Sequence, residues 1–136
     1  RQSTLTRLGA HLGPADAGSA PVGFVLVGGL VVVLFVAVLQ LALVLHVRTT
    51  LVDAAAEGAR LAARADSTPQ DGVDRTAHLL TGSLSERYAQ DVVAGTVTRD
   101  DVLLAEVTVT APAPVIGLIG SAGTITVRGH AIMEQQ

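Results

Sequence analysis

The dominant feature of the hydropathy pattern is an apolar run with no charged side chain between Asp16 and Arg48. Its most apolar part, residues 21–45, would be about 37 Å long as a helix. The hydrocarbon core of a bilayer is ~30 Å thick, so this run can cross a membrane once, with some tilt. Gln40 and His46, near its C-terminal end, are tolerated there if they find polar neighbours. The pattern therefore predicts a transmembrane helix.

Three interpretations of this run have to be separated: a cleaved secretory signal, a plain membrane anchor, and the spine of a filament subunit. The apolar region of a secretory signal is roughly 7–15 residues long, and this run is about twice that length. An Ala-Arg-Ala triplet at 63–65 has the spacing of a signal cleavage site but lies far beyond the run. We therefore expect the helix to stay on the mature protein, as an anchor or as a spine.

The flanking charges predict the orientation. Arg1 and Arg7 precede the run, whereas Arg48 after it is soon followed by acidic residues. The positive-inside rule then puts the N-terminus in the cytoplasm and residues 48–136 outside the membrane. Because the first residue is Arg and not Met, we also expect the sequence to lack its true start.

The helix is predicted to continue beyond the membrane. Residues 47–65 are rich in Ala and contain no Pro, so helix propensity is high, and the signal to stop is the Asp-Ser-Thr-Pro stretch at 66–69. A helix over 21–65 would be about 67 Å long. Helical spacing places charged residues on one stripe, and these are Asp53, Glu57, Arg60 and Arg64. Small and apolar residues face the opposite way, and these are Leu51, Ala55, Gly58 and Ala62.

These four residues, called here the helix packing face, have two interpretations. They can pack against the C-terminal part of the same chain. Alternatively, small side chains can let the helices of neighbouring subunits approach closely, as they do in membrane interfaces. The pattern alone leaves both open.

The C-terminal part is predicted to be a small α+β head. Residues 71–89 have apolar positions at helical spacing, which indicates a second helix weakened by Gly82. Alternating apolar and polar positions then predict three antiparallel strands, with Asp100-Asp101 as a turn, over residues 92–98, 101–110 and 124–133. The apolar loop at 111–123 is expected to dock on the sheet, on the membrane surface or on a partner.

Composition argues against several kinds of chemistry. The chain has 136 residues and no Cys, which excludes disulfides, zinc–thiolate sites and thiol catalysis. Its four His residues are scattered, and no nucleophile, phosphate loop or metal-ligand spacing is evident. Residues 48–136 hold seven Arg and eleven acidic residues, which argues against a nucleic-acid partner. We expect no enzymatic activity, no catalytic residues, no cofactor and no metal.

The start of the apolar run resembles that of TadE-like pilin subunits. That family begins its long apolar helix with Gly-Ser-Ala-x-Val-Glu-Phe, and the matching residues here are Gly18, Ser19, Ala20, Val22 and Phe24. A later small-residue segment of the family, Ala-x-x-Gly-Ala-Arg, is matched by Ala55, Gly58, Ala59 and Arg60. The resemblance covers residues 16 to about 65 well and the remainder loosely.

The resemblance implies a minor pilin or an assembly component of a tight-adherence (Flp-type, type IV-related) pilus in the bacterial cell membrane. It implies a pilin-like fold, other pilin or pilus-assembly subunits as partners, and cleavage between Gly18 and Ser19 by a prepilin peptidase. The expected organisation is a cytoplasmic leader (1–18), a transmembrane helix (19–47), an amphipathic extension (48–68) and an extracytoplasmic head (69–136).

One residue departs from the family pattern. The family has Glu five residues after the cut, where this chain has Gly23. That Glu is thought to pair with the N-terminal amine of a neighbouring subunit, and Gly23 cannot make the pair. An alternative function therefore stays open: a single-pass membrane protein, unrelated to pili, whose small outer domain binds another envelope protein.

Overall fold

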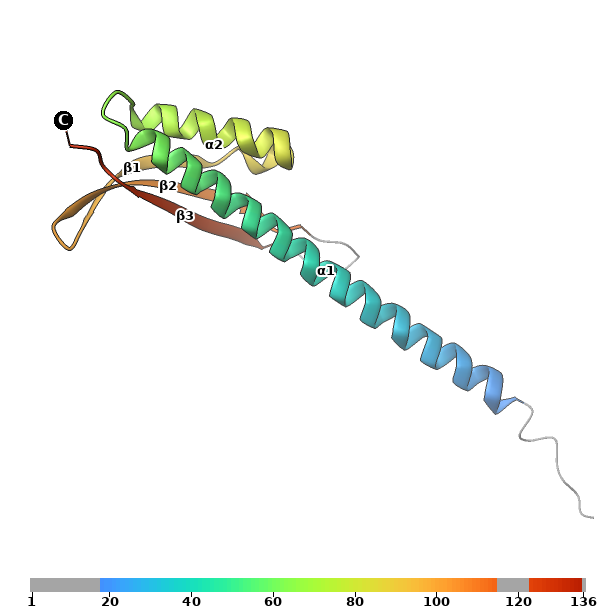
Figure 1. Cartoon of the computed structure of the whole chain (residues 1–136). Helices are drawn as coiled ribbons and strands as arrows, with labels where there is room; N and C mark the ends of the chain where they lie inside the picture. Colours follow the sequence, from blue (N-terminus) through green and yellow to red (C-terminus); the bar gives the residue numbers. More distant parts are fainter. Residues whose placement is uncertain (1–17, 115–122, 136) are drawn as a thin grey trace, which may run out of the picture. The chain divides into compact units, whose positions relative to one another are not determined.

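A computed structural model describes residues 18–114 and 123–135, which form two helices, a short 3-10 helix and three strands (Figure 1). The elements are α1 (Ser19–Ala62), α2 (Pro69–Ser83), η2 (Glu86–Tyr88), β1 (Val92–Arg99), β2 (Val102–Pro112) and β3 (Thr124–Ile132). The chain divides into two compact units, Arg1–Val38 and Leu39–Gln136, which are described separately below. The predicted combination of a long apolar helix, a second helix and a three-stranded antiparallel sheet is confirmed.

The described part of the first unit is the N-terminal portion of α1. Every side chain from Ser19 to Val38 is exposed, including Phe24 and Phe35 at 81% and 68%. Pro21 lies in the first helical turn, where its missing N–H costs no hydrogen bond. The predicted helix over 21–65 is thus confirmed, although α1 begins two residues earlier and ends three residues earlier.

In the second unit, the sheet has the order β1-β2-β3 and both strand pairs are antiparallel. A two-residue turn, Asp100-Asp101, joins β1 to β2, and both residues have positive φ, 51° and 63°. This is the backbone twist that a tight hairpin needs, although Asn-Gly is the more usual sequence for it. The predicted turn is therefore present, with two Asp residues in the left-handed region.

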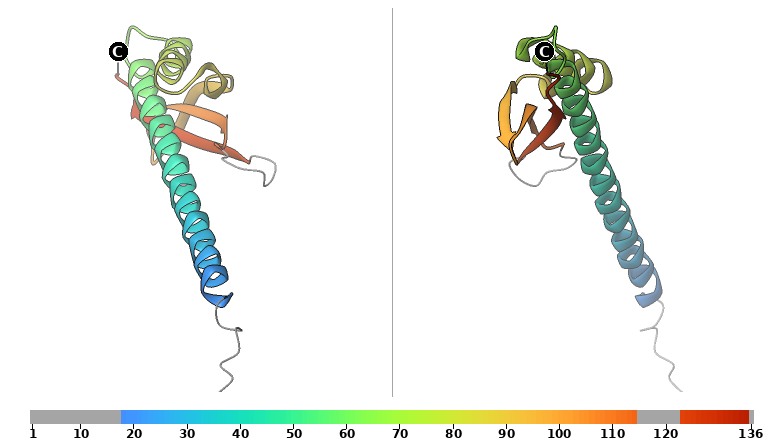
Figure 2. Two further views of the ribbon diagram at one scale, coloured as in Figure 1. Left: turned by 90° about the vertical axis from the view of Figure 1, so that its right-hand side faces the viewer. Right: turned by 60° about the vertical axis from the view of Figure 1, so that its left-hand side comes forward.

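The sheet is covered on one face, by the second part of α1 and by α2 (Figures 1 and 2). Alternate residues of the central strand β2 point toward the helices and are buried, namely Ala105, Val107, Val109 and Ala111. Leu103 belongs to the same alternation but is 47% exposed, because it lies next to the hairpin turn at the end of the sheet. The largest side chains without solvent contact are Leu51, Leu80, Val107 and Val109, which form the centre of this core.

The Asp-Ser-Thr-Pro stretch that was predicted to stop the first helix starts the second one. Thr68 is the N-cap of α2 and Pro69 occupies its first position, where a fixed φ and a missing N–H are both favourable. The second helix was predicted as one element over 71–89. It is divided, because α2 ends at Ser83, one residue after Gly82, and the chain turns again through η2 to bury Tyr88.

Candidate functional site

The predicted cleavage pair lies at the start of α1. Gly18 is in the turn before the helix, Ser19 is its first residue, and both are exposed. A peptidase that binds an extended backbone would thus meet the last non-helical residue at this point. Residues 1–17, the rest of the predicted leader, lie outside the described residues. Cleavage at Gly18 stays a prediction.

Gly23, which replaces the family's Glu, lies one turn into α1 and is exposed. A Cβ atom added at this residue would meet nothing within 4 Å. The chain's own packing therefore does not require a glycine here, and a longer side chain would be sterically accommodated. The reason for this departure from the family pattern has to lie outside the contacts of the described residues.

The apolar surface of the first unit has the dimensions of a membrane segment. Among the described helices, α1 is the one that is long and apolar enough to cross a bilayer. Its exposed part, from Ser19 to Val38, is about 20 residues and thus ~30 Å long, which matches the hydrocarbon core of a bilayer. This match supports a single membrane crossing and carries no information on its direction.

The helix packing face is covered by the second unit itself. Leu51 and Ala55 have no exposed surface, Ala62 is 4% exposed, and Gly58 is also buried. At Gly58 the backbones of α1 and α2 cross so closely that an added Cβ would lie 2.7 Å from the carbonyl oxygen of Gly72. Of the two interpretations left open by the sequence, packing within the chain accounts for this face.

A second close approach joins α1 to the edge strand β3. A Cβ atom added at Gly129 would overlap the backbone of Ala55 and Ala56. Glycine thus permits direct contact between the strand and the helix at this point. Alternation along the strand puts Gly129 on its inward face, but the sequence pattern gives no reason for a residue without a side chain there.

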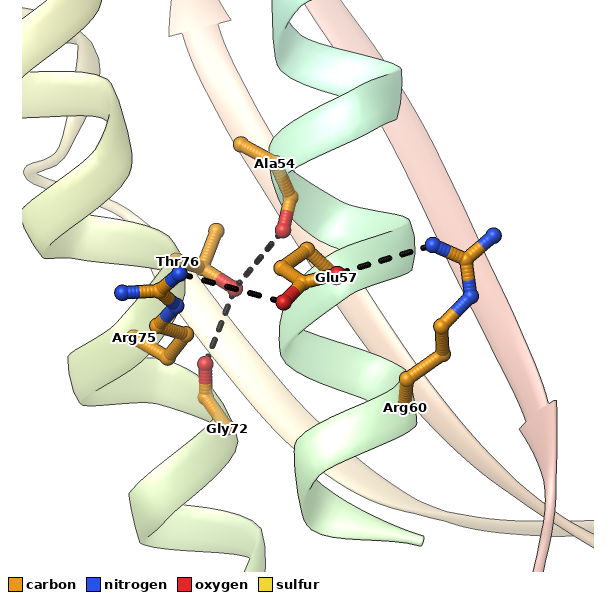
Figure 3. A network of polar contacts seen from close by, with 6 residues as sticks. All are labelled: Ala54, Glu57, Arg60, Gly72, Arg75 and Thr76. Atoms are coloured by element: carbon orange, nitrogen blue, oxygen red, sulfur yellow. Dashed lines mark hydrogen bonds and ion pairs between the residues drawn. The ribbon is translucent and has the colours of Figure 1, made fainter.

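The charged stripe forms polar contacts along the crossing of the helices (Figure 3). The two carboxylate oxygens of Glu57 lie 3.5 Å from Nη1 of Arg60 and 3.8 Å from Nη2 of Arg75. Beneath them, the buried hydroxyl of Thr76 lies 2.8 Å from the carbonyl oxygen of Gly72 and 3.3 Å from that of Ala54, and can donate to either. The ion pairs are exposed and contribute little, whereas the buried hydroxyl links the two helices at their closest approach.

Gln40, the polar residue inside the apolar run, belongs to the second unit and has a hydrogen-bond partner in that unit. Its Nε2 donates a hydrogen bond of 2.6 Å to the carbonyl oxygen of Pro114. Val47, seven residues later, is already part of the head's core, and Leu43 packs against that core. The end of the apolar run thus serves the folding of the head. The apolar loop predicted at 111–123 lies largely outside the described residues, which stop at Pro114 and resume at Gly123.

The start of α2 carries a titratable group with a shifted pKa. The carboxylate of Asp71 accepts hydrogen bonds from the backbone N–H and the hydroxyl of Thr68, at 2.7 and 2.8 Å. Both hydrogen bonds favour the charged form and therefore lower the pKa of Asp71 below its ordinary value. The bond from the backbone N–H contributes more than the bond from the hydroxyl. In return, the hydroxyl of Thr68 accepts from the N–H of Asp71, which completes a capping box.

Sequence reasoning missed a charged groove of about 460 Å³ beside β3. It is lined by Arg48, Val52, Arg99, Glu106, Thr126, Val127, Arg128 and His130. Glu106 and His130 are cross-strand neighbours, and Nε2 of His130 lies 2.6 Å from Oε2 of Glu106. Alternation predicted that both residues point away from the core, but the register that pairs them depends on the loop between β2 and β3.

Within the described ranges, no group of three or more His, Cys, Asp or Glu residues is arranged to hold a metal ion. The scattered histidines are not brought together there, and His130 has Glu106 as its neighbour. What the described geometry can do is anchor, pack and associate.

Comparison with known proteins gives one match. The family model of TadE-like proteins matches residues 18–60, a range that begins at the predicted cleavage pair and ends within the charged stripe. No curated protein matches the chain, and no solved structure does. Similarity to this family implies a role in the assembly of tight-adherence pili, or a pilin-like role within them. Over residues 18–60, which include the exposed apolar helix and most of the helix packing face, this chain is similar to TadE-like proteins.

Proposed function

We propose that this protein is a minor pilin-like subunit, or an assembly component, of a tight-adherence pilus and that its role is structural and not enzymatic. One observation carries the proposal. α1 begins with about 20 residues whose apolar side chains are all exposed and continues as a central part of a folded head. The TadE-like match extends over both parts of the helix.

The exposed part of α1 requires an apolar environment. Large Val, Leu and Phe side chains surround the helix between Ser19 and Val38, and a continuous apolar surface of this size is not stable in water. A bilayer covers such a surface before assembly, and the helices of neighbouring subunits can cover it in a filament. We place the membrane segment of the proposed anchor at Ser19–Val38, because from Gln40 onward the helix has partners in the head.

Orientation belongs to the proposal as well. Arg1 and Arg7 before the apolar segment favour a cytoplasmic N-terminus, which puts the head outside the membrane. The bond between Gly18 and Ser19 is then on the cytoplasmic side, where a prepilin peptidase, a membrane aspartyl protease, would act. The other proposed partners are pilin or pilus-assembly subunits that share the membrane.

The test is the intact mass of the membrane-extracted protein after expression with and without an active prepilin peptidase. We expect a loss corresponding to all residues up to Gly18, only when the peptidase is present. A Gly18→Ile variant is the matched control, since a bulky side chain before the cut hinders entry of the backbone into the protease cleft and should leave the mass unchanged.

An unchanged mass of the unmodified protein beside an active peptidase would contradict the processed-pilin proposal. It would favour the alternative function, a permanent single-pass anchor whose outer domain binds another envelope protein. Cleavage of the Gly18→Ile variant at the same rate would show that Gly18 is not the residue that the peptidase recognises.

A further inference from the structure

The charges of the head are unevenly distributed. Residues 48–136, which comprise the head and the helical segment that packs on it, carry seven Arg and eleven acidic residues, so this part of the chain is acidic as a whole. The groove beside β3 is the exception, because Arg48, Arg99 and Arg128 line it together with a single acidic residue, Glu106. A basic groove on an acidic domain fits an anionic partner, and it fits other parts of the same acidic surface.

Among the described residues, no arginine of this groove forms an ion pair. In the part of the chain that the structure describes, the ion pairs join Glu57 to Arg60 and Arg75, and Glu106 is in hydrogen-bond contact with His130. None of them includes Arg48, Arg99 or Arg128. The carboxylate of Glu106 is held by His130 at 2.6 Å, so it is not a full partner for three guanidinium groups. A forked guanidinium binds a carboxylate with two parallel hydrogen bonds, which makes carboxylates suitable ligands here.

The same head presents a pair of carboxylates in the hairpin turn between β1 and β2. Asp100 and Asp101 are exposed, and no described basic side chain forms an ion pair with them. Their positive φ angles place two non-glycine residues in a conformation that Asn-Gly would adopt at lower cost. Asp is one of the residues that tolerate this conformation, so the turn accounts for the backbone, but no described ion pair uses the two charges, which remain available for binding.

We propose that the basic groove lined by Arg48, Arg99 and Arg128 receives the Asp100-Asp101 turn of a second copy of this chain. Groove and turn adjoin each other, because Arg99 of the groove directly precedes Asp100, so the contact can be reciprocal within a pair of copies or can be repeated from copy to copy. The inference rests on the proposed function, in which the subunits of a pilus share one membrane before assembly. It adds that the heads, and not only the apolar helices, recognise each other.

The absence of Cys from the chain permits a direct test with the full-length protein in membranes. One copy carries Thr126→Cys in the groove, and a second, differently tagged copy carries Thr98→Cys beside the turn. After mild oxidation we expect a disulfide-linked heterodimer. A copy with Ser83→Cys, exposed on α2, replaces the turn copy as the matched control and should form little of this product.

Two variants separate recognition from folding. Replacing Asp100 by Asn and Asp101 by Gly removes both charges and at the same time suits the turn better, so loss of cross-linking cannot be caused by a damaged hairpin. Arg128→Glu in the groove copy should also lower cross-linking, by about tenfold. Combining Arg128→Glu in one copy with Asp101→Arg in the other should restore it, whereas Arg64→Glu, outside the groove, should have no effect.

Two results would overturn this inference: equal cross-linking with and without the Asp pair, or no heterodimer from the two copies that carry only Thr126→Cys and Thr98→Cys. Its failure is distinguishable from that of the proposed function, because the mass loss caused by the peptidase does not depend on contact between heads. Conversely, cross-linking through the groove in a chain that is never processed would support the contact and contradict only the prepilin step.

Discussion

The two parts of α1 have opposite relationships to their surroundings. From Ser19 to Val38 the helix carries Val, Leu and Phe side chains that are all exposed. In the second unit, Ala, Gly and Thr predominate from Thr49 to Ala62, and one face of the helix is fully buried. The first part has bulky, exposed side chains, whereas the second has small side chains and packs against α2 and β3.

The difference follows from what each part has to contact. Lipid chains are fluid and adapt to any shape, so a membrane segment needs apolar side chains but no complementary surface. A strand or a helix is rigid, so its backbone can approach α1 only where side chains are missing. Gly58 meets Gly72 in this way, and Gly129 meets Ala55. Stability of the head should accordingly be sensitive to single methyl groups, and the membrane segment should not.

The largest expected effect is that of Gly129→Ala. The added methyl group would overlap the backbone of Ala55 and Ala56, which cannot move aside as a flexible side chain could. We expect a loss of about 3 kcal/mol in the free energy of unfolding, at the upper end of the range for overpacking. Chemical denaturation of the protein in detergent, followed by circular dichroism, measures it. Gly95→Ala, in β1 at the opposite edge of the sheet and with open space at its Cβ, should change stability by less than a third of this amount, and equal losses would contradict the close contact.

The variants Gly58→Ala and Gly28→Ala compare the effect of one added methyl group in the two parts of α1. At Gly58 the new methyl group would meet the hydroxyl of Thr76 and the carbonyl of Gly72, so we expect a loss of about 2 kcal/mol. At Gly28 nothing lies within 4 Å, and alanine is the better helix former, so stability should not fall. The same denaturation experiment serves for both. A similar loss at both positions would show that Gly28 is packed against something other than lipid.

A smaller effect is expected for Thr76→Val, which keeps the shape and removes the hydroxyl between α1 and α2. Because this hydroxyl is buried and bonds the carbonyl oxygens of Gly72 and Ala54, its loss should cost about 1 kcal/mol. Thr49→Val is the control, since its hydroxyl is exposed and bonds only within α1. An unchanged midpoint for Thr76→Val would mean that the hydroxyl contributes nothing at the crossing.

The smallest effect concerns pH and the capping box of α2. The pKa of Asp71 is lowered in the folded protein, chiefly by the backbone N–H of Thr68. The stabilisation is therefore complete above the ordinary Asp pKa of about 4 and is lost as the pH falls through the lower pKa of the folded state. Asp71→Asn should lower stability at neutral pH, with a difference from the unmodified protein that shrinks in acid. A difference that stayed constant between neutral and acidic pH would contradict the role of the charge.

The sequence predicted the elements better than their contacts. The apolar run, the Ala-rich extension and the alternating strands each depend on local periodicity, and α1 and the three strands were found for that reason. The stretch at 66–69 was recognised as the end of one helix but not as the start of the next, although Thr68 and Asp71 have the spacing of a capping box. The same residues can end one helix or begin another, and these roles can be distinguished only when it is known that a second helix follows at once.

Contacts between distant segments could not be predicted in the same way. The pairing of Glu106 with His130 depends on the register of β2 and β3, which a long connection leaves open. The helix packing face was recognised, but its partner was not, because small residues suit a neighbouring subunit as well as the chain's own sheet. Gly72 and Gly129 are informative only once the close approaches are known.

The central claim is that Ser19–Val38 lies in the membrane while the head lies outside. Single Cys substitutions in this cysteine-free chain test it most directly, with a membrane-impermeant maleimide on intact cells that lack the peptidase. We expect Ser83→Cys to be labelled at once, Ser3→Cys only after the cells are opened, and Val33→Cys in neither case until detergent is added. Labelling of Val33→Cys in intact membranes would contradict the membrane segment, and labelling of Ser3→Cys in place of Ser83→Cys would reverse the orientation.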